Sequence, residues 1–105
     1  MHTPRKAKEA LQALGAQIRM ARKRRVWTIA DLSTKIGVSA PTIIALEKGV
    51  PTVSAGVLVS ALWTLGMESE LVELTRPKDE EGIKLMNSRL PQKIKTSKRR
   101  IKNDF

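Results

Sequence analysis

The chain has 105 residues, enough for one small domain and a tail, and its 20 basic and 10 acidic residues give a formal net charge of +10, which favours a polyanionic partner such as nucleic acid. It contains no cysteine, which excludes disulfides and thiolate metal sites and fits a reducing cytoplasm. The only histidine is His2, and no nucleophile–base pairing or phosphate-binding loop is evident, so we expect neither an enzyme nor a metal or cofactor site.

The charge divides unevenly along the chain. Residues 1–75 hold 10 basic and 6 acidic residues, a net charge of +4, whereas residues 76–105 hold 10 and 4, a net charge of +6. Apolar residues become sparse beyond that boundary, and Arg76-Pro77 is incompatible with a continuing helix. We therefore predict a globular domain over about residues 5–75 and a basic extended tail over residues 76–105.

The first predicted helix runs from about Pro4 to Arg25. Its apolar residues recur on one face at the helical period, and they are Leu11, Leu14, Ile18 and Ala21. Gly15 lies inside this helix, where glycine lowers helix stability. We interpret it as a position that another helix approaches closely.

Three further helices share one start signal, a hydroxyl residue that caps the helix between two apolar residues. The three sets are Trp27/Thr28/Leu32, Val38/Ser39/Ile43 and Val53/Ser54/Leu58. Asp31, three residues after Thr28, completes a variant of the capping box. These signals predict helices over Thr28–Ile36, from Ser39 to about Lys48 and from Ser54 to about Leu65, each followed by glycine.

A short fifth helix is predicted over about Glu68–Leu74, and no strand pattern appears. The uncharged run at residues 49–67 is interrupted by Pro51 and is marginal in length for a membrane span, so we expect a buried helix there and no membrane association. The expected core includes one face of the second helix and both tryptophans, that is Ala30, Leu32, Ile36, Trp27 and Trp63.

Residues 14–67 resemble the helix-turn-helix domain of the Xre and phage-repressor type. The residues that carry the resemblance are Leu14, Gly15, Ile18, Arg19, Arg22, Thr28, Leu32, Ile36, Gly37, Val38, Ser39, Thr42, Ile43, Leu46, Glu47, Lys48 and Gly49. The resemblance implies an all-α fold, the five-helix lambda-repressor-like DNA-binding domain. It makes the helix that begins at Ser39 the recognition helix, which enters the major groove.

The resemblance further implies that outward residues near the start of this helix read base edges, namely Ala40, Pro41, Thr42 and, one turn on, Ala45. None of them is the arginine, asparagine or glutamine that makes bidentate base contacts. Ala45 and the Thr42 methyl suit a thymine methyl, and the Thr42 hydroxyl suits a base edge. Direct readout should be modest, so specificity should rest partly on dimer spacing and DNA shape. For Ile44, a contact with DNA and a contact with protein both stay open.

The candidate phosphate contacts are of two kinds. Thr28 and Ser39 lie at helix N-termini, which favour anions. The candidate cations are Lys35, Lys48, Arg5, Lys6 and Lys8, with a solvated surface charge as the alternative for each lysine. Related domains often carry glutamine directly after the threonine of the second helix, where this chain has Ile29.

Arg22 begins a run of four basic residues, and such a run spreads over most of a helix circumference. In the resembling family the residue at Arg22 pairs with the residue at Glu47, which joins the first helix to the recognition helix. Lys23, Arg24 and Arg25 are then expected to contribute positive field rather than base contacts.

The segment at residues 79–95 resembles the tails of HipB-like antitoxins, which are Xre-type proteins encoded beside HipA-like Ser/Thr kinase toxins. Such antitoxins repress their own operon and bind the toxin. The resemblance implies a HipA-like kinase as partner, and the candidate anchors on it are Ile83, Leu85, Met86 and Leu90. The run Lys93–Lys102 could instead follow the DNA backbone, and a solubilising tail is the third alternative.

Together these features predict a homodimeric, sequence-specific repressor that binds an inverted repeat in double-stranded DNA and regulates its own toxin-antitoxin module. The dimer contact is expected on the last two helices of the domain, with Leu65, Met67, Leu71 and Leu74 as candidates. Two alternatives remain. One is a stand-alone Xre-type regulator of a phage or restriction-modification system, and the other is an antitoxin that acts mainly as a protein-interaction module.

Overall fold

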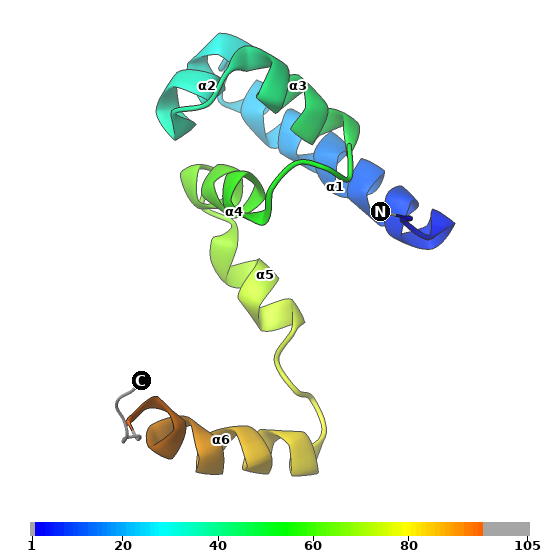
Figure 1. Ribbon diagram of the computed structural model, residues 1–105. Coiled ribbons are helices and arrows are strands. Elements are labelled where there is room, and N and C mark those ends of the chain that lie inside the picture. Colours follow the sequence, from blue (N-terminus) through cyan, green and yellow to red (C-terminus); the bar gives the residue numbers. More distant parts are fainter. Residues whose placement is uncertain (1, 96–105) are drawn as a thin grey trace. The chain divides into compact units, whose positions relative to one another are not determined.

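The structure is a computed structural model that describes the backbone of residues 2–95 and the side chains of residues 2–88. This part of the chain is all helical and contains no strand, which confirms the predicted fold class. The six helices are α1 (Arg5–Arg24), α2 (Ile29–Ile36), α3 (Ala40–Lys48), α4 (Ala55–Thr64), α5 (Glu68–Leu74) and α6 (Glu80–Lys95) (Figure 1). The chain divides into two compact units, residues 1–70 and residues 71–105, which are described separately below.

The three predicted hydroxyl caps are present, and they fix where α2, α3 and α4 begin. The Thr28 hydroxyl accepts a hydrogen bond from the Asp31 amide at 3.0 Å, and the Ser54 hydroxyl accepts one from the Val57 amide at 3.1 Å. The Ser39 hydroxyl accepts a longer bond, 3.4 Å, from the Thr42 amide. Because each bond satisfies an otherwise unpaired amide of the first turn, a cap of this kind stabilises its helix by about 1 kcal/mol.

The core of the first unit lies between α1, α2, α3 and α4. α3 packs on both α1 and α2, and α2 also packs on α4 (Figure 1). The fully buried large side chains are Ile18, Leu32 and Ile43, one from each of the first three helices. The other buried apolar residues are Leu46, Ala61, Leu62 and Leu65.

Two residues that were expected in the core lie on the surface. Trp63 is 67% exposed, because the helical period places Ala61, Leu62 and Leu65 on the inward face of α4 and turns residue 63 away from it. Ala30 is exposed for the same reason, since the inward face of α2 is centred on Leu32. The expectation for Trp63 rested on the small number of aromatic residues in the chain and did not consider which face of α4 the residue occupies.

α1 and α3 approach each other closely at Gly15, as the sequence predicted. A Cβ atom at this position would lie 2.5 Å from the Glu47 carbonyl oxygen and 2.7 Å from the Leu46 carbonyl oxygen. Both of these are backbone atoms, which cannot rotate away. The absence of a side chain at residue 15 is therefore what allows the backbone of α3 to lie on α1.

Val26, just beyond the end of α1, has a left-handed backbone conformation that the sequence did not predict. Val26 has a φ of 58°, in the left-handed region, and it is 87% exposed. Its amide donates to the Lys23 carbonyl, and the Trp27 amide donates to the Arg22 carbonyl, which together form a Schellman motif. A β-branched residue is strained in this conformation, where glycine or asparagine is usual.

The second unit contains α6, which corrects part of the predicted extended tail. The Asp79 carboxylate accepts a hydrogen bond from the Gly82 amide at 3.2 Å, and Glu80 and Glu81 occupy the first turn, where negative charge favours a helix. Composition had suggested an extended segment because apolar residues are sparse there, but the acidic residues at 79–81 are arranged as a helix start. Residues 96–102 of the basic run fall outside the described residues.

Candidate nucleic-acid interface

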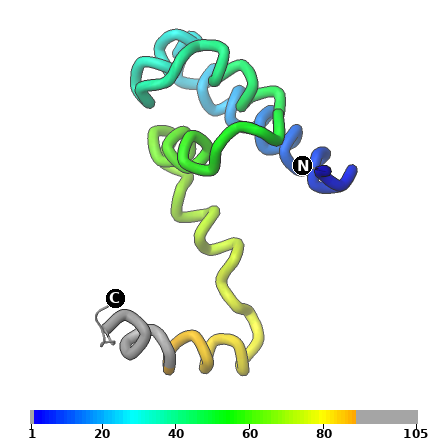
Figure 2. The backbone as a smooth tube through the Cα atoms, viewed as in Figure 1, coloured from blue at the N-terminus to red at the C-terminus, as the bar shows by residue number. Residues whose placement is uncertain are grey.

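α2 and α3 form a helix-turn-helix. The two helices are bent by 106° across the connection at residues 37–39, within the range of about 90–120° that is usual for this motif (Figure 2). Gly37 has a φ of 85°, and the amides of Gly37 and Val38 both donate to the Ser33 carbonyl, at 2.8 and 3.0 Å. The left-handed glycine thus closes α2 and sends the chain directly into the Ser39 cap of α3.

The outward face of α3 is a stripe about two helical turns long. Pro41, Ile44, Ala45 and Lys48 recur at the i, i+3, i+4, i+7 spacing that shares one face, while Ile43 and Leu46 are buried on the opposite face. Pro41, Ile44 and Lys48 are exposed and Ala45 is half-buried. Of the four residues predicted to read bases, Pro41 and Ala45 lie on this stripe.

The other two predicted base-reading residues flank the stripe. Ala40 and Thr42 are both half-buried. The Thr42 hydroxyl lies 2.9 Å from the Ser39 hydroxyl and bonds to it, so the cap engages the only polar side chain of the predicted set. The sequence left Ile44 undecided, and the structure places it on the outward stripe with 39% of its surface exposed.

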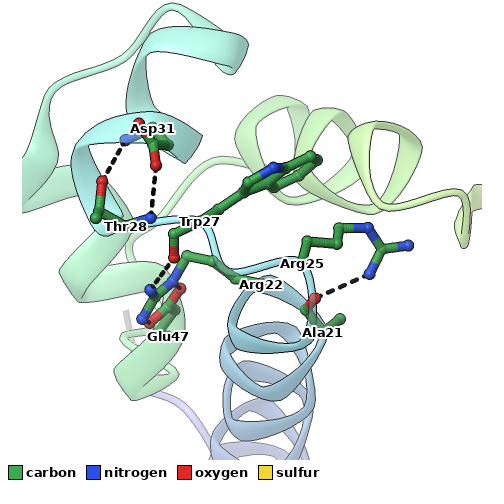
Figure 3. Close-up of polar contacts among 7 residues, drawn as sticks. All are labelled: Ala21, Arg22, Arg25, Trp27, Thr28, Asp31 and Glu47. Atoms are coloured by element: carbon green, nitrogen blue, oxygen red, sulfur yellow. Dashed lines mark hydrogen bonds and ion pairs between the residues drawn. The ribbon is translucent and has the colours of Figure 1, made fainter.

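A buried ion pair fixes α3 to α1. The Arg22 Nε donates to the Glu47 Oε2 at 2.7 Å and its Nη2 donates to the Glu47 Oε1 at 3.0 Å, while Nη1 donates to the Trp27 carbonyl at 2.8 Å (Figure 3). Both side chains are only 6% exposed. The hydrogen bonds with Glu47 raise the pKa of the Arg22 guanidinium, against the effect of burial, so the guanidinium stays charged. The structure thus brings together the two residues that the resemblance paired.

Arg25 has a structural role that the sequence analysis did not predict. Its guanidinium donates to the Ala21 carbonyl at 2.8 Å (Figure 3). It also donates to the Leu65 carbonyl at 2.8 Å, so it joins the end of α1 to the end of α4. The guanidinium also lies 5.7 Å from the centre of the Trp27 ring, and the Lys35 ammonium lies 4.6 Å from the same ring. Cations at these distances are attracted to the ring face. Lys35, a predicted phosphate contact, is therefore also a cation–π partner.

The predicted phosphate contact at Thr28 carries a complete capping box. The Thr28 amide donates to the Asp31 carboxylate at 2.8 Å, and the Thr28 hydroxyl accepts from the Asp31 amide (Figure 3). These bonds lower the pKa of Asp31, so its carboxylate is charged at neutral pH. The Thr28 hydroxyl can therefore still donate its proton to a phosphate, whereas the Thr28 amide already donates to the Asp31 carboxylate.

The other cations on the predicted list are exposed. Lys48 lies at the end of the outward stripe, and Lys6 lies in the first turn of α1. The Arg5 Nε lies 3.5 Å from the Glu9 Oε2 in a surface ion pair. An open groove of about 350 Å³ runs beside the stripe, and its lining residues are Arg19, Ile29, Ile44, Glu47 and Lys48. Arg19 was not among the predicted contacts, although it is one of the residues that carry the family resemblance.

The predicted dimer contact is partly changed by the structure. Leu65 is 2% exposed, because it belongs to the core, so it is not available to a second copy of the chain. Met67 is half-buried. The large apolar side chains of α4 that are free to meet another molecule are Val59, 42% exposed, and Trp63.

The tail anchors that were predicted for a toxin lie on α6. Ile83 and Leu85 are exposed and Met86 is half-buried, while the side chain of Leu90 lies outside the described residues.

Within the described residues, no single helix is long and apolar enough to cross a membrane, and only the bent α2–α3 pair reaches that length and composition when both helices are counted together.

A family model described as "Helix-turn-helix domain" matches residues 13–74, more than half of the chain. No curated protein and no solved structure shows significant similarity to the chain.

Proposed function

Because the chain belongs to the helix-turn-helix domain family, we propose that it is a sequence-specific DNA-binding transcriptional repressor that acts as a homodimer in the cytoplasm. The observation that carries this proposal is that three features fix the position of α3. Its start is set by the Ser39 cap, its angle to α2 is 106°, and its last turn is tied to α1 by the Arg22–Glu47 pair. These constraints hold one exposed helix face in a fixed orientation, which major-groove recognition requires.

The dimensions of that face fit the groove. An α-helix with its side chains is about 10–12 Å across, which matches the width of about 12 Å of the major groove of B-DNA. The outward stripe from Pro41 to Lys48 covers seven helical steps, which is about 10 Å along the groove at about 1.5 Å per residue. The unit of residues 1–70 contains 10 basic and 5 acidic residues, so its net charge of +5 attracts the phosphate backbone.

A homodimer would place two copies of α3 in successive major grooves of an inverted repeat, about 34 Å apart or a multiple of that distance. We propose Val59 and Trp63 as the dimer contact within residues 1–70. They are four positions apart on α4, so they share one face, and both are exposed. Sedimentation analysis of Trp63→Lys tests this contact: the variant should be monomeric at concentrations where the unsubstituted chain is dimeric.

The DNA-binding proposal is tested by selecting duplexes from a random library and measuring the affinity of the selected site over a range of salt concentrations. We expect affinity to fall steeply as salt rises, because phosphate contacts release counterions. Thr42→Glu should abolish specific binding, since it places a negative charge at the start of the recognition helix. Ser69→Glu, which adds the same charge at an exposed position of α5, is the matched control and should retain binding. Retained binding by Thr42→Glu would contradict the assignment of α3.

We further propose that the protein is the HipB-like antitoxin of a toxin-antitoxin module and that its partner is a HipA-like Ser/Thr kinase. The support is the tail resemblance together with the exposed apolar residues Ile83 and Leu85 on α6. The full chain with Ile83→Asp and Leu85→Asp should lose binding to a kinase encoded by the neighbouring gene and keep its operator affinity. Full kinase binding by that variant would contradict the role of α6.

The alternative is a stand-alone Xre-type regulator of a phage or restriction-modification system, which would bind its operator without a protein partner. An antitoxin that acts mainly as a protein-interaction module is the second alternative. Operator binding by the chain alone, measured with and without the neighbouring gene product, separates the three cases.

A further inference from the structure

The outward stripe of α3 presents almost no hydrogen-bonding group to a ligand. Its first three members are Pro41, Ile44 and Ala45, none of which has a polar side-chain atom. The neighbouring Thr42 hydroxyl is engaged by the Ser39 hydroxyl at 2.9 Å. Polar base edges facing such a surface would lose their water without gaining a partner, which is unfavourable. The surface therefore favours a ligand whose contacting groups are apolar.

The surroundings of this apolar stripe are charged. Lys48 closes one end of it, and Arg19 lies across the groove that Ile44 lines. The acidic residue of that groove, Glu47, is neutralised by its buried pair with Arg22. The result is an apolar strip with exposed cations beside it, which is complementary to apolar groups flanked by phosphates.

The major groove of DNA offers one apolar group that fits this description, the C5-methyl group of thymine. Ile44 is the largest exposed apolar side chain of the stripe, 39% exposed. The half-buried Ala45 follows it along the same face. A stripe of about 10 Å faces about three base-pair steps, so more than one methyl group lies within its length.

We propose, on the basis of the DNA-binding function proposed above, that this protein selects its operator mainly through thymine methyl groups and that Ile44 is the principal residue that contacts them. Ala45 contacts a second methyl group, and Lys48 and Arg19 bind the adjacent phosphates. The half-site is then defined by where thymines stand in the groove rather than by hydrogen bonds to purines.

The test is to replace each thymine of the selected half-site with uracil, one position at a time, because uracil lacks only the methyl group. At the positions facing α3, each replacement should weaken binding about three- to fivefold, the effect of losing one buried methyl contact. In the full chain with Ile44→Ala, the loss on uracil replacement should disappear at the position that Ile44 faces. Val72→Ala on α5, where the valine is 61% exposed and belongs to neither the stripe nor the proposed dimer contact, is the matched control and should keep the full thymine-to-uracil ratio.

The outcomes separate this inference from the function on which it rests. Specific binding that is unaffected by uracil at every half-site position overturns the methyl readout and leaves the repressor proposal standing. Uracil sensitivity that persists unchanged in Ile44→Ala overturns the role of Ile44. Failure to select any sequence from the library overturns both proposals.

Discussion

Replacement of Gly15 by alanine would test the close contact on which the position of the recognition helix depends. In the interior of an exposed helix this substitution is stabilising by about 1 kcal/mol, because alanine loses less conformational freedom than glycine on folding. At residue 15 the added Cβ would meet the carbonyl oxygens of Glu47 and Leu46 at 2.5 and 2.7 Å. α3 would have to move by about 0.9 Å to bring the shorter contact to 3.4 Å, an ordinary van der Waals distance.

The magnitude follows from the two opposing effects. Overpacking costs about 1–3 kcal/mol, and contacts with rigid backbone place Gly15→Ala at the upper end of that range. After the gain in helix propensity, the free energy of unfolding should fall by about 2 kcal/mol. For a domain of this size such a loss lowers Tm by roughly 10 °C.

The assay is urea unfolding followed by circular dichroism, with Gly56→Ala as the matched control. Gly56 lies in α4, and the nearest atom to its Cβ position, the Ser54 hydroxyl oxygen, is 3.8 Å away, an ordinary contact. That variant should be unchanged or slightly more stable. If Gly15→Ala is as stable as Gly56→Ala, α1 and α3 are not packed as closely as described and the reasoning fails.

Three further predictions concern the remaining features of the first unit. Arg22→Ala should lower the free energy of unfolding by about 3 kcal/mol, because it leaves the Glu47 carboxylate buried without a partner; urea unfolding should also show that Arg22→Met combined with Glu47→Met costs less than the sum of the two single variants. Val26→Gly should raise Tm, with a gain in stability of about 0.5–1 kcal/mol, because it removes the strain of a left-handed β-branched residue; an unchanged or lower Tm would contradict that strain. Asp31→Asn should be less stable than the unsubstituted chain at pH 7, and the difference should begin to shrink below about pH 4 and should vanish only below the lowered pKa of Asp31 in the folded chain. The hydrogen bonds to Asp31 lower its pKa on folding, so their contribution is present above the unfolded pKa and is lost as the pH falls through the folded value; unfolding measured from pH 2 to 7 checks this.

The amino-acid sequence by itself determined the local features of this fold, above all where the helices begin. The starts of α2, α3 and α4 were predictable because a cap depends only on residues three or four positions apart in the chain, such as Thr28 and Asp31. Gly15 and the Arg22–Glu47 pair were found in advance as well, the first from an unfavourable residue inside a helix and the second from a family resemblance. The candidate site could be placed on α3 for the same reasons.

Only the tertiary structure decided which sides of the helices are covered. Trp63 was expected in the core and lies on the surface, and Leu65 was expected at a dimer contact and lies in the core, because burial depends on the phase of α4 against its neighbours and not on residue type. The same holds for the recognition helix. Ile44 is as apolar as Ile43, and their separation into one exposed and one buried residue follows from how α3 packs on α1 and α2, which involves residues that are distant in the sequence.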